Sequence, residues 1–146
     1  MKAYKTLTHT DIINIESRTR SELINKISGF KSPVLVGTVN SNGIYNLSII
    51  SSIFHIGSKP PLLGMILRPH TEKYSHTLKN IISSQQFTIS HIHHELIDQA
   101  HRCSTKFPDN VSEFECVGLN PIIHQQDHWV APAVSESKIR LGLSLN

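Results

Sequence analysis

The tripeptide Ser41-Asn42-Gly43 limits the folds open to this chain more than any other short stretch. Asn and Gly tolerate the positive φ angles that a two-residue turn demands, and apolar runs flank the tripeptide on both sides. The preceding run, VLVGTV, is rich in β-branched residues, which suit a pleated, half-buried surface. The pattern predicts a β-hairpin with strands at residues 34–40 and 44–54, and therefore a mainly β fold.

Further elements follow from hydrophobic periodicity. Helical spacing predicts one helix over residues 10–28, N-capped by Thr10 and bent near Ser17, and short helices at 77–84 and 95–103. The first short helix is expected to turn Leu78, Ile81 and Ile82 inward, and the second Leu96, Ile97 and Ala100. Further strands are expected at 62–67, buried and preceded by a loop at Pro60-Pro61, at 87–92 and at 138–145. Residues 113–119 are short and mixed in character.

Length and composition indicate one globular domain. The 146 residues are enough for a single core, with a helical segment at 1–30 and a β domain at 33–146. No apolar run reaches membrane-spanning length and the N-terminus has no apolar signal region, so a cytoplasmic location is the default. The net charge of +3 comes from scattered Lys and Arg residues without interleaved aromatics, which does not favour nucleic acid.

Several common kinds of chemistry lack their motifs. The chain has neither the GxGxxG of a dinucleotide-binding fold nor the GxSxG of a hydrolase. Cys103 and Cys116 have neither zinc nor redox spacing, and free thiols are expected. The sequence His91-Ile92-His93-His94 places two imidazoles on one strand face, but a third metal ligand is available only by assumption. A polar strand end is the favoured interpretation of that segment.

The predicted second hairpin strand carries unusual polarity for a core strand. Asn46, Ser48, Ser51 and Ser52 alternate with apolar residues. Small hydroxyl groups and backbone amides along a strand edge can hold a phosphate or a planar heterocycle. A surface strand with solvated Ser side chains explains the same residues, and the pattern alone leaves both interpretations open.

An ordered set of residues resembles the flavin reductase-like branch of the FMN-binding split barrels. The set is Asn46-x-Ser48-x-x-Ser51, Phe54, Pro60-Pro61, Arg68, His76-Thr77-Leu78-x-Asn80-Ile81 and Glu113-Phe114-Glu115 before Gly118-Leu119. The resemblance implies a Greek-key-like split barrel over residues 33–146, on which the N-terminal segment packs. Members of that family run on beyond the strand that ends here near Asn146. The closing C-terminal strands are therefore expected to be missing, either because the chain is a fragment or because a partner chain covers the edge.

The resemblance also implies a set of FMN-binding residues. The flavin ring and ribityl chain would lie along Asn46, Ser48, Ile49, Ile50, Ser51 and Ser52. Arg68 and Thr77 would hold the phosphate, with His76 and Asn80 beside them. One position departs from the family pattern: Ser75 stands where members often have a basic residue, and Lys73 or Lys79 would have to replace that charge.

The function implied by the resemblance is that of a flavin reductase. Hydride would pass from NADH or NADPH to flavin N5, and the protein would be a homodimer with the flavin near the subunit boundary. No catalytic acid or base is expected, because the chemistry belongs to the cofactor. Two alternatives stay open: a flavin or haem carrier on the same barrel with no turnover, and a structural protein whose site has degenerated.

Overall fold

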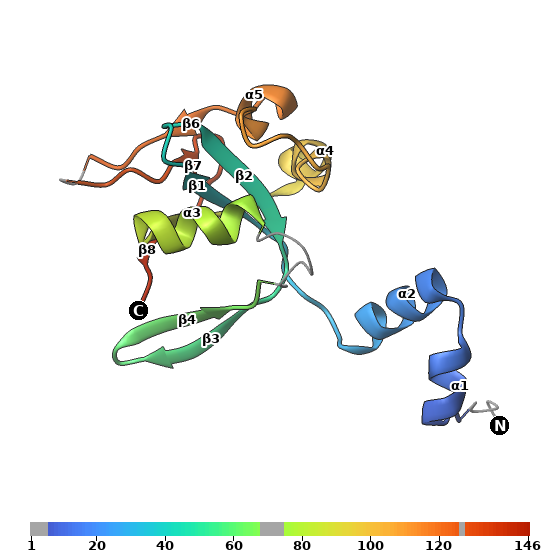
Figure 1. Ribbon diagram of the computed structural model, residues 1–146. Coiled ribbons are helices and arrows are strands. Elements are labelled where there is room, and N and C mark those ends of the chain that lie inside the picture. Colours follow the sequence, from blue (N-terminus) through green and yellow to red (C-terminus); the bar gives the residue numbers. More distant parts are fainter. Residues whose placement is uncertain (1–5, 68–74, 126–127) are drawn as a thin grey trace. The chain divides into compact units, whose positions relative to one another are not determined.

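The computed structural model describes residues 6–67, 75–125 and 128–146, and Figure 1 traces them. Arg68 and Lys73 lie outside the described residues. The chain divides into two compact units, Met1–Lys31 and Ser32–Asn146. The described helices include none with the length and hydropathy that a membrane span requires.

The N-terminal unit holds two helices where the periodicity predicts one. Helix α1 spans His9–Asn14 and α2 spans Ser17–Ile27. The chain breaks at Glu16 because its carboxylate accepts hydrogen bonds from the backbone amides of Arg18 and Thr19, which caps α2. These bonds also lower the pKa of Glu16. The predicted N-cap at Thr10 is likewise wrong, since Thr8 forms a capping box with Asp11.

The larger unit is built on a four-stranded antiparallel sheet. Its order is β2-β1-β5-β8, with β1 at Val34–Val39, β2 at Tyr45–Ile50, β5 at Gln86–His91 and β8 at Arg140–Ser144. The predicted hairpin is confirmed, with Val39 opposite Tyr45 and Val34 opposite Ile50. The Asn40 side-chain oxygen accepts hydrogen bonds from the backbone amides of Asn42 and Ile44, and Gly43 adopts a φ of 77°. The turn chemistry therefore sets the register of the central strand pair.

A second hairpin follows directly. Strand β3 (Ile53–Ser58) pairs antiparallel with β4 (Pro61–Met65), so the predicted strand at 44–54 is split in two. The split falls at Ser51-Ser52, where the Ser52 hydroxyl donates to the Ile66 carbonyl and diverts the chain away from β1. The expectation of a buried strand at 62–67 is wrong, because β4 is only partly buried.

The remaining elements are short. Helix α3 spans His76–Ser84, a 3-10 turn at His94–Leu96 leads into α4 (Ile97–Arg102), and α5 covers Glu113–Val117. A small ladder pairs β6 (Pro121–Ile122) with β7 (Ala133–Val134). Ile82 and Ile97 were expected to face inward but are more than half exposed. Both helices are too short for periodicity alone to fix the buried face.

The two faces of the sheet have separate cores. In Figure 1, α3 lies apart from α4 and α5. On the α3 side, Val34, Val36 and Ile89 pack with Ile81. On the opposite side, residues of β1 and β2 pack against α4, α5 and β7; this core is Leu35, Leu47, Leu96, Ala100, Cys103, Phe114, Val117, Leu119 and Val134. Alternation along each strand thus sends neighbouring residues to different environments.

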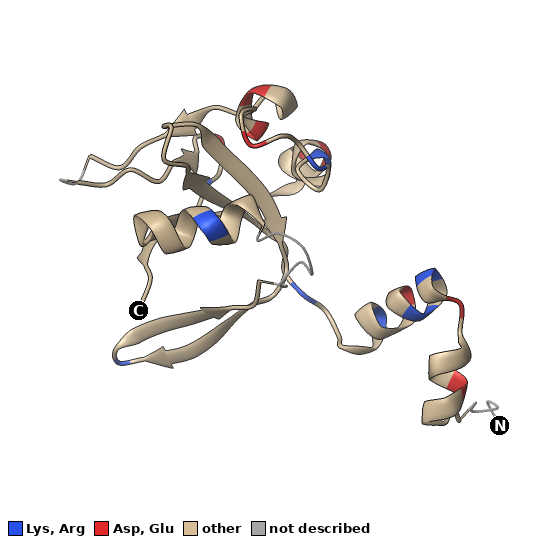
Figure 2. Cartoon of the chain, in the orientation of Figure 1, with Lys and Arg blue, Asp and Glu red and all other residues tan. Residues whose placement is uncertain are grey.

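The described strands form this sheet and two two-stranded ladders, without a closed barrel. An apolar groove of about 790 Å³ lies between the β3–β4 hairpin, α3 and the end of β8. Three described basic residues of the larger unit lie on different elements, with Lys59 at the β3–β4 turn, Lys79 on α3 and Arg102 on α4 (Figure 2). The expectation that closing C-terminal strands are missing stays a prediction.

Candidate functional site

Three of the residues expected to bind FMN meet on the α3 face of the sheet. The hydroxyl oxygens of Ser48 and Thr77 are 2.6 Å apart. The Asn46 side-chain amide donates to the Thr77 hydroxyl at 3.2 Å and lies 3.5 Å from the Ser48 hydroxyl. The group Asn46, Ser48 and Thr77, called the polar triad below, joins residues of β2 and α3 that are far apart in sequence.

Local structure explains how the polar triad forms. Asn46 and Ser48 are alternate residues of β2, so both side chains leave the sheet on the α3 side. Helix α3 begins at His76 because the Ser75 hydroxyl accepts the Leu78 amide as N-cap, which puts Thr77 in the first turn. The residue that departs from the family pattern therefore has a local structural role here.

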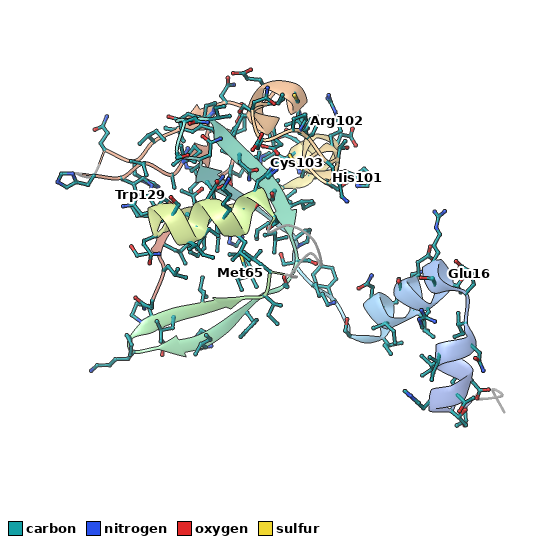
Figure 3. All side chains as sticks on the ribbon, viewed as in Figure 1. Glu16, Met65, His101, Arg102, Cys103 and Trp129 are labelled. Carbon is teal, nitrogen blue, oxygen red and sulfur yellow. The ribbon has the colours of Figure 1, made fainter. Side chains whose placement is uncertain are left out.

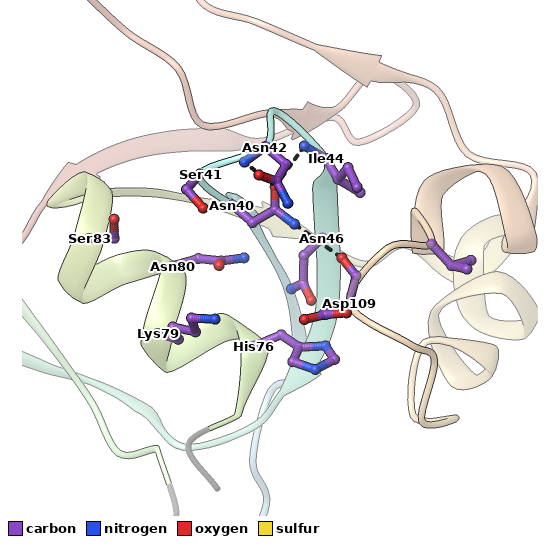
Figure 4. Close-up of a pocket in the computed structure, with 11 residues that line it drawn as sticks. Asn40, Ser41, Asn42, Ile44, Asn46, His76, Lys79, Asn80, Ser83 and Asp109 are labelled. Atoms are coloured by element: carbon purple, nitrogen blue, oxygen red, sulfur yellow. Dashed lines mark hydrogen bonds between the residues drawn. The ribbon is translucent and has the colours of Figure 1, made fainter.

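Asn80 and His76 lie beside the polar triad and line a pocket of about 70 Å³ (Figure 4). The Asn80 side-chain amide of α3 donates to the Thr38 hydroxyl of β1 at 3.1 Å. The sequence interpretation named Lys79 only as a replacement for the basic residue lost at position 75, and it missed much of the lining, namely Asn40, Ser41, Asn42, Ile44, Ser83, Asp109 and Val111. Its helical part could have been found, because 76, 79, 80 and 83 share one helix face. Asp109 could not, because the 104–112 loop approaches only in the folded chain, where the Asn40 amide donates to the Asp109 carbonyl.

The other predicted residues of this segment do not form one surface. The Ile49 side chain packs on the α5 side of the sheet and Ile50 on the α3 side. Ser51 is exposed, and Ser52 uses its hydroxyl to hold the Ile66 carbonyl at 2.6 Å. A ligand lying along this segment would therefore contact backbone groups as well as side chains.

The outer edge of β2 carries a buried carboxyl group that the sequence interpretation did not assign to the site. The Leu47 amide donates to Glu113 Oε2 at 3.0 Å, and Glu113 is 5% exposed. Burial raises the pKa of Glu113, while the bonds from Leu47 and from its own backbone amide act in the opposite direction. Because edge amides alternate in an antiparallel strand, the Ile49 amide also points to this edge.

The remaining reactive side chains do not assemble a centre. Cys103 lies at the end of α4 (Figure 3), and burial raises the pKa of its thiol to about 12, so the thiolate is scarce at neutral pH. His93 Nε2 is 3.1 Å from the Glu136 carbonyl, and His93 Nδ1 is 3.4 Å from a Glu95 carboxylate oxygen. Within residues 6–67, 75–125 and 128–146, no group of three or more His, Cys, Asp and Glu has metal-binding geometry.

The fold and the polar triad together define a mainly β domain with short helices, of the split-barrel type found in flavin reductases. The chain belongs to the flavin reductase like domain family, whose sequence profile matches residues 27–145. The resemblance carried by the ordered residues from Asn46 to Leu119 is therefore confirmed.

Two solved structures show the similarity in three dimensions. One, from Shewanella frigidimarina NCIMB 400, is named as a candidate flavin reductase with a split barrel domain; it is 40% identical with a TM-score of 0.88, and the match covers 97% of this chain and 68% of that one. The other, flavoredoxin of Desulfovibrio vulgaris (Miyazaki F), is 26% identical with a TM-score of 0.70 over 80% of this chain and 60% of that one.

A curated relative from Aquifex aeolicus (strain VF5), an uncharacterised protein, is 26% identical over 112 residues. The match covers 75% of this chain and 56% of that relative. The chain thus spans little more than half the length of the curated relative it matches.

Proposed function

We propose that this chain binds FMN along β2 and the start of α3, and that it belongs to the NAD(P)H-dependent flavin reductases. The observation that carries the proposal is the polar triad, which stands beside the outer edge of β2 in a chain of the flavin reductase like family. The full set of proposed FMN contacts remains Asn46, Ser48, Ile49, Ile50, Ser51, Ser52, Arg68, His76, Thr77 and Asn80.

The donors present suit a flavin. An isoalloxazine ring offers two carbonyl oxygens and the nitrogens N1 and N5 as acceptors of hydrogen bonds from amides and hydroxyls, and its N3–H group donates. The Ile49 amide points to the outer edge of β2 by strand alternation, and the Ser51 side chain is exposed next to it. The pocket of about 70 Å³ beside α3 has room for a small part of such a ligand, and the Lys79 side chain supplies a positive charge there, with His76 also in the lining.

Each group of the chain then has a limited task. When bound, the flavin supplies a hydride acceptor, so the protein needs to bind and orient two ligands rather than to transfer protons itself. Backbone amides of β2 orient the ring, and the polar triad fixes the side chains nearest to it. A nicotinamide donor would bind transiently, since the chain lacks a GxGxxG motif. A homodimer in which the partner closes the site remains part of the proposal.

The first test is a titration of the purified protein with FMN, followed by flavin fluorescence, with riboflavin and FAD in parallel. Micromolar or tighter FMN binding, together with steady oxidation of NADH or NADPH when FMN is added, supports the reductase proposal. Flavin binding without oxidation of either nucleotide would favour the carrier alternative. Absence of binding to all three flavins would favour the structural alternative and overturn the proposal.

Arg68→Ala is expected to weaken FMN binding by about tenfold or more, because a guanidinium bond to phosphate contributes about 1.5–3 kcal/mol. Riboflavin, which has no phosphate, should bind the variant and the original protein equally. Arg102→Ala is the matched control, since Arg102 lies on α4 and donates to the Cys116 carbonyl. An equal loss of FMN and riboflavin affinity would contradict a phosphate role for Arg68.

Thr77→Val is expected to weaken FMN binding by about threefold to tenfold and riboflavin binding by less, because Thr77 is proposed to hold the phosphate that riboflavin lacks. The hydroxyl is the shared partner of Asn46 and Ser48, so its removal, worth about 1 kcal/mol for such bonds, leaves both side chains free to turn away. Thr88→Val is the matched control, because Thr88 is equally buried but donates to the Pro132 carbonyl on the opposite face of the sheet. Equal changes of affinity in the two variants would show that the effect is general destabilisation.

A further inference from the structure

The Glu113 carboxyl group bonds an edge-strand amide that a neighbouring strand would otherwise pair with. Glu113 is the first residue of α5, and its buried carboxyl group accepts the outward-pointing amide of the edge strand β2. An edge strand leaves alternate amides unpaired, and these are normally bonded by water, a further strand or a partner. Here the Glu113 side chain, from the second half of the chain, accepts a hydrogen bond from one of these amides, that of Leu47.

The position of the Leu47 amide links Glu113 to the proposed site. Leu47 lies between Asn46 and Ser48, the two members of the polar triad on β2. On the inner side, β2 is held by β1, with Thr38 opposite Asn46 and Val36 opposite Ser48. Glu113 holds the outer side at the residue between them. The two side chains are therefore aimed at Thr77 by a strand that is fixed at both edges.

We propose that Glu113 is a positioning residue of the flavin site, which acts through the Leu47 amide on Asn46 and Ser48 and makes flavin affinity depend on its protonation. The inference rests on the proposed flavin-binding function. Glu113 is not a catalytic residue, since the polar triad and not Glu113 would contact the ligand.

The ionised carboxyl group is the better partner for an amide, because charged acceptors form the stronger hydrogen bonds. The groups that face it are few among the described residues. His76 of α3 lowers the pKa of Glu113, and the Cys103 thiol of α4, itself influenced by Arg102, stays neutral with a pKa of about 12. Burial outweighs these effects and moves the ionisation of Glu113 above the ordinary value of 4.5.

Affinity and stability should then respond to pH in opposite directions. The raised pKa of Glu113 means that the folded chain holds the proton more tightly than the unfolded chain. The contribution of Glu113 to the free energy of unfolding is therefore present at low pH and is lost as the pH rises above 4.5 through the folded pKa. Flavin affinity should instead increase over the same range, because ionisation strengthens the bond to Leu47. A merely structural role would move both quantities in the same direction.

The experiment measures riboflavin affinity and urea unfolding from pH 5 to pH 8, above the ordinary carboxyl pKa of 4.5, for the original protein, Glu113→Gln, Glu113→Ala and the control Glu115→Gln. Riboflavin is used because it has no phosphate to titrate. Glu113→Gln keeps an acceptor, so it should bind within about threefold of the original protein at low pH but without the increase at higher pH. Glu113→Ala should bind about tenfold more weakly at pH 8, and Glu115→Gln should keep the original profile. Parallel profiles for the original protein and Glu113→Gln would overturn the inference.

Amide hydrogen exchange separates this inference from the proposed function. Glu113→Ala should speed exchange of the Leu47 amide by about tenfold or more, while the Ser48 amide, bonded toward β1, stays protected. Unchanged exchange at Leu47 would overturn the positioning role even if flavin binds normally. Faster exchange in a protein that binds no flavin would overturn the proposed function and the flavin part of the inference, and would leave Glu113 as the residue that fixes β2.

Discussion

Gly37→Ala is expected to lower the free energy of unfolding by about 3 kcal/mol or more, through overpacking against atoms that cannot move aside. An added Cβ would meet the Pro132 carbonyl oxygen closer than real Cβ atoms ever lie, and would stand 2.7 Å from the Thr88 hydroxyl oxygen. Pro132 is held in place because Thr88 donates to its carbonyl. Relief of the clash requires β1 to separate from the 131–134 segment, which would disrupt the core on that face of the sheet.

The measurement is urea-induced unfolding followed by far-ultraviolet circular dichroism. Gly57→Ala is the matched control, since its Cβ would meet only the Pro60 carbonyl at 3.5 Å, an ordinary contact. The control should change the free energy of unfolding by about 1 kcal/mol or less. A Gly37→Ala protein as stable as the control would show that β1 and the 131–134 segment are not packed as described.

Phe114→Ala is expected to lower the free energy of unfolding by about 3–5 kcal/mol, the range seen when a buried aromatic side chain is truncated. The Phe114 side chain is fully buried, and its ring meets that of Tyr45 edge to face with centroids 6.3 Å apart. It is the largest fully buried side chain among the described residues. Its removal leaves a cavity between α5 and β2 that neighbours fill only in part.

The same unfolding experiment tests this expectation. Phe54→Ala is the control, because Phe54 is 49% exposed on the β3–β4 hairpin. This variant should lower the free energy of unfolding by about a third as much or less. Equal losses for the two variants would contradict the burial of Phe114 in the core on the α5 side of the sheet. A larger loss at Phe54 would place a major part of the stability in the hairpin.

The β-hairpin was predictable because its information is local. An Asn-Gly turn and the alternation of β1 and β2 are properties of neighbouring residues, and Asn40 adds two hydrogen bonds within the same turn. The start of α3 is similarly local, since the Ser75 hydroxyl reaches the amide three residues on. The helix predicted over 10–28 failed because Glu16 also acts locally, and its capping bonds were not foreseen.

Errors of burial had a different cause. Residues 62–67 are continuously apolar, as expected of a core strand. Among the described strands, however, β4 pairs only with β3, and it stays partly exposed. Ile82 and Ile97 lie on helices whose apolar sides are wider than the surfaces that cover them. An apolar sequence indicates that burial of its side chains is favourable. Which of these side chains are buried depends on packing partners distant in the chain.

For the site, the sequence by itself determined the strand and helix that carry Asn46, Ser48 and Thr77, and the family to which the chain belongs. Only the tertiary structure decided that these three side chains contact one another, that the 104–112 loop borders the pocket, and that Glu113 bonds the Leu47 amide. The physical reason is the sequence distance over which each interaction acts. Turn, cap and strand preferences act within a few residues, whereas the Glu113 bond spans 66 residues and forms only once packing has excluded water from the α5 side of β2.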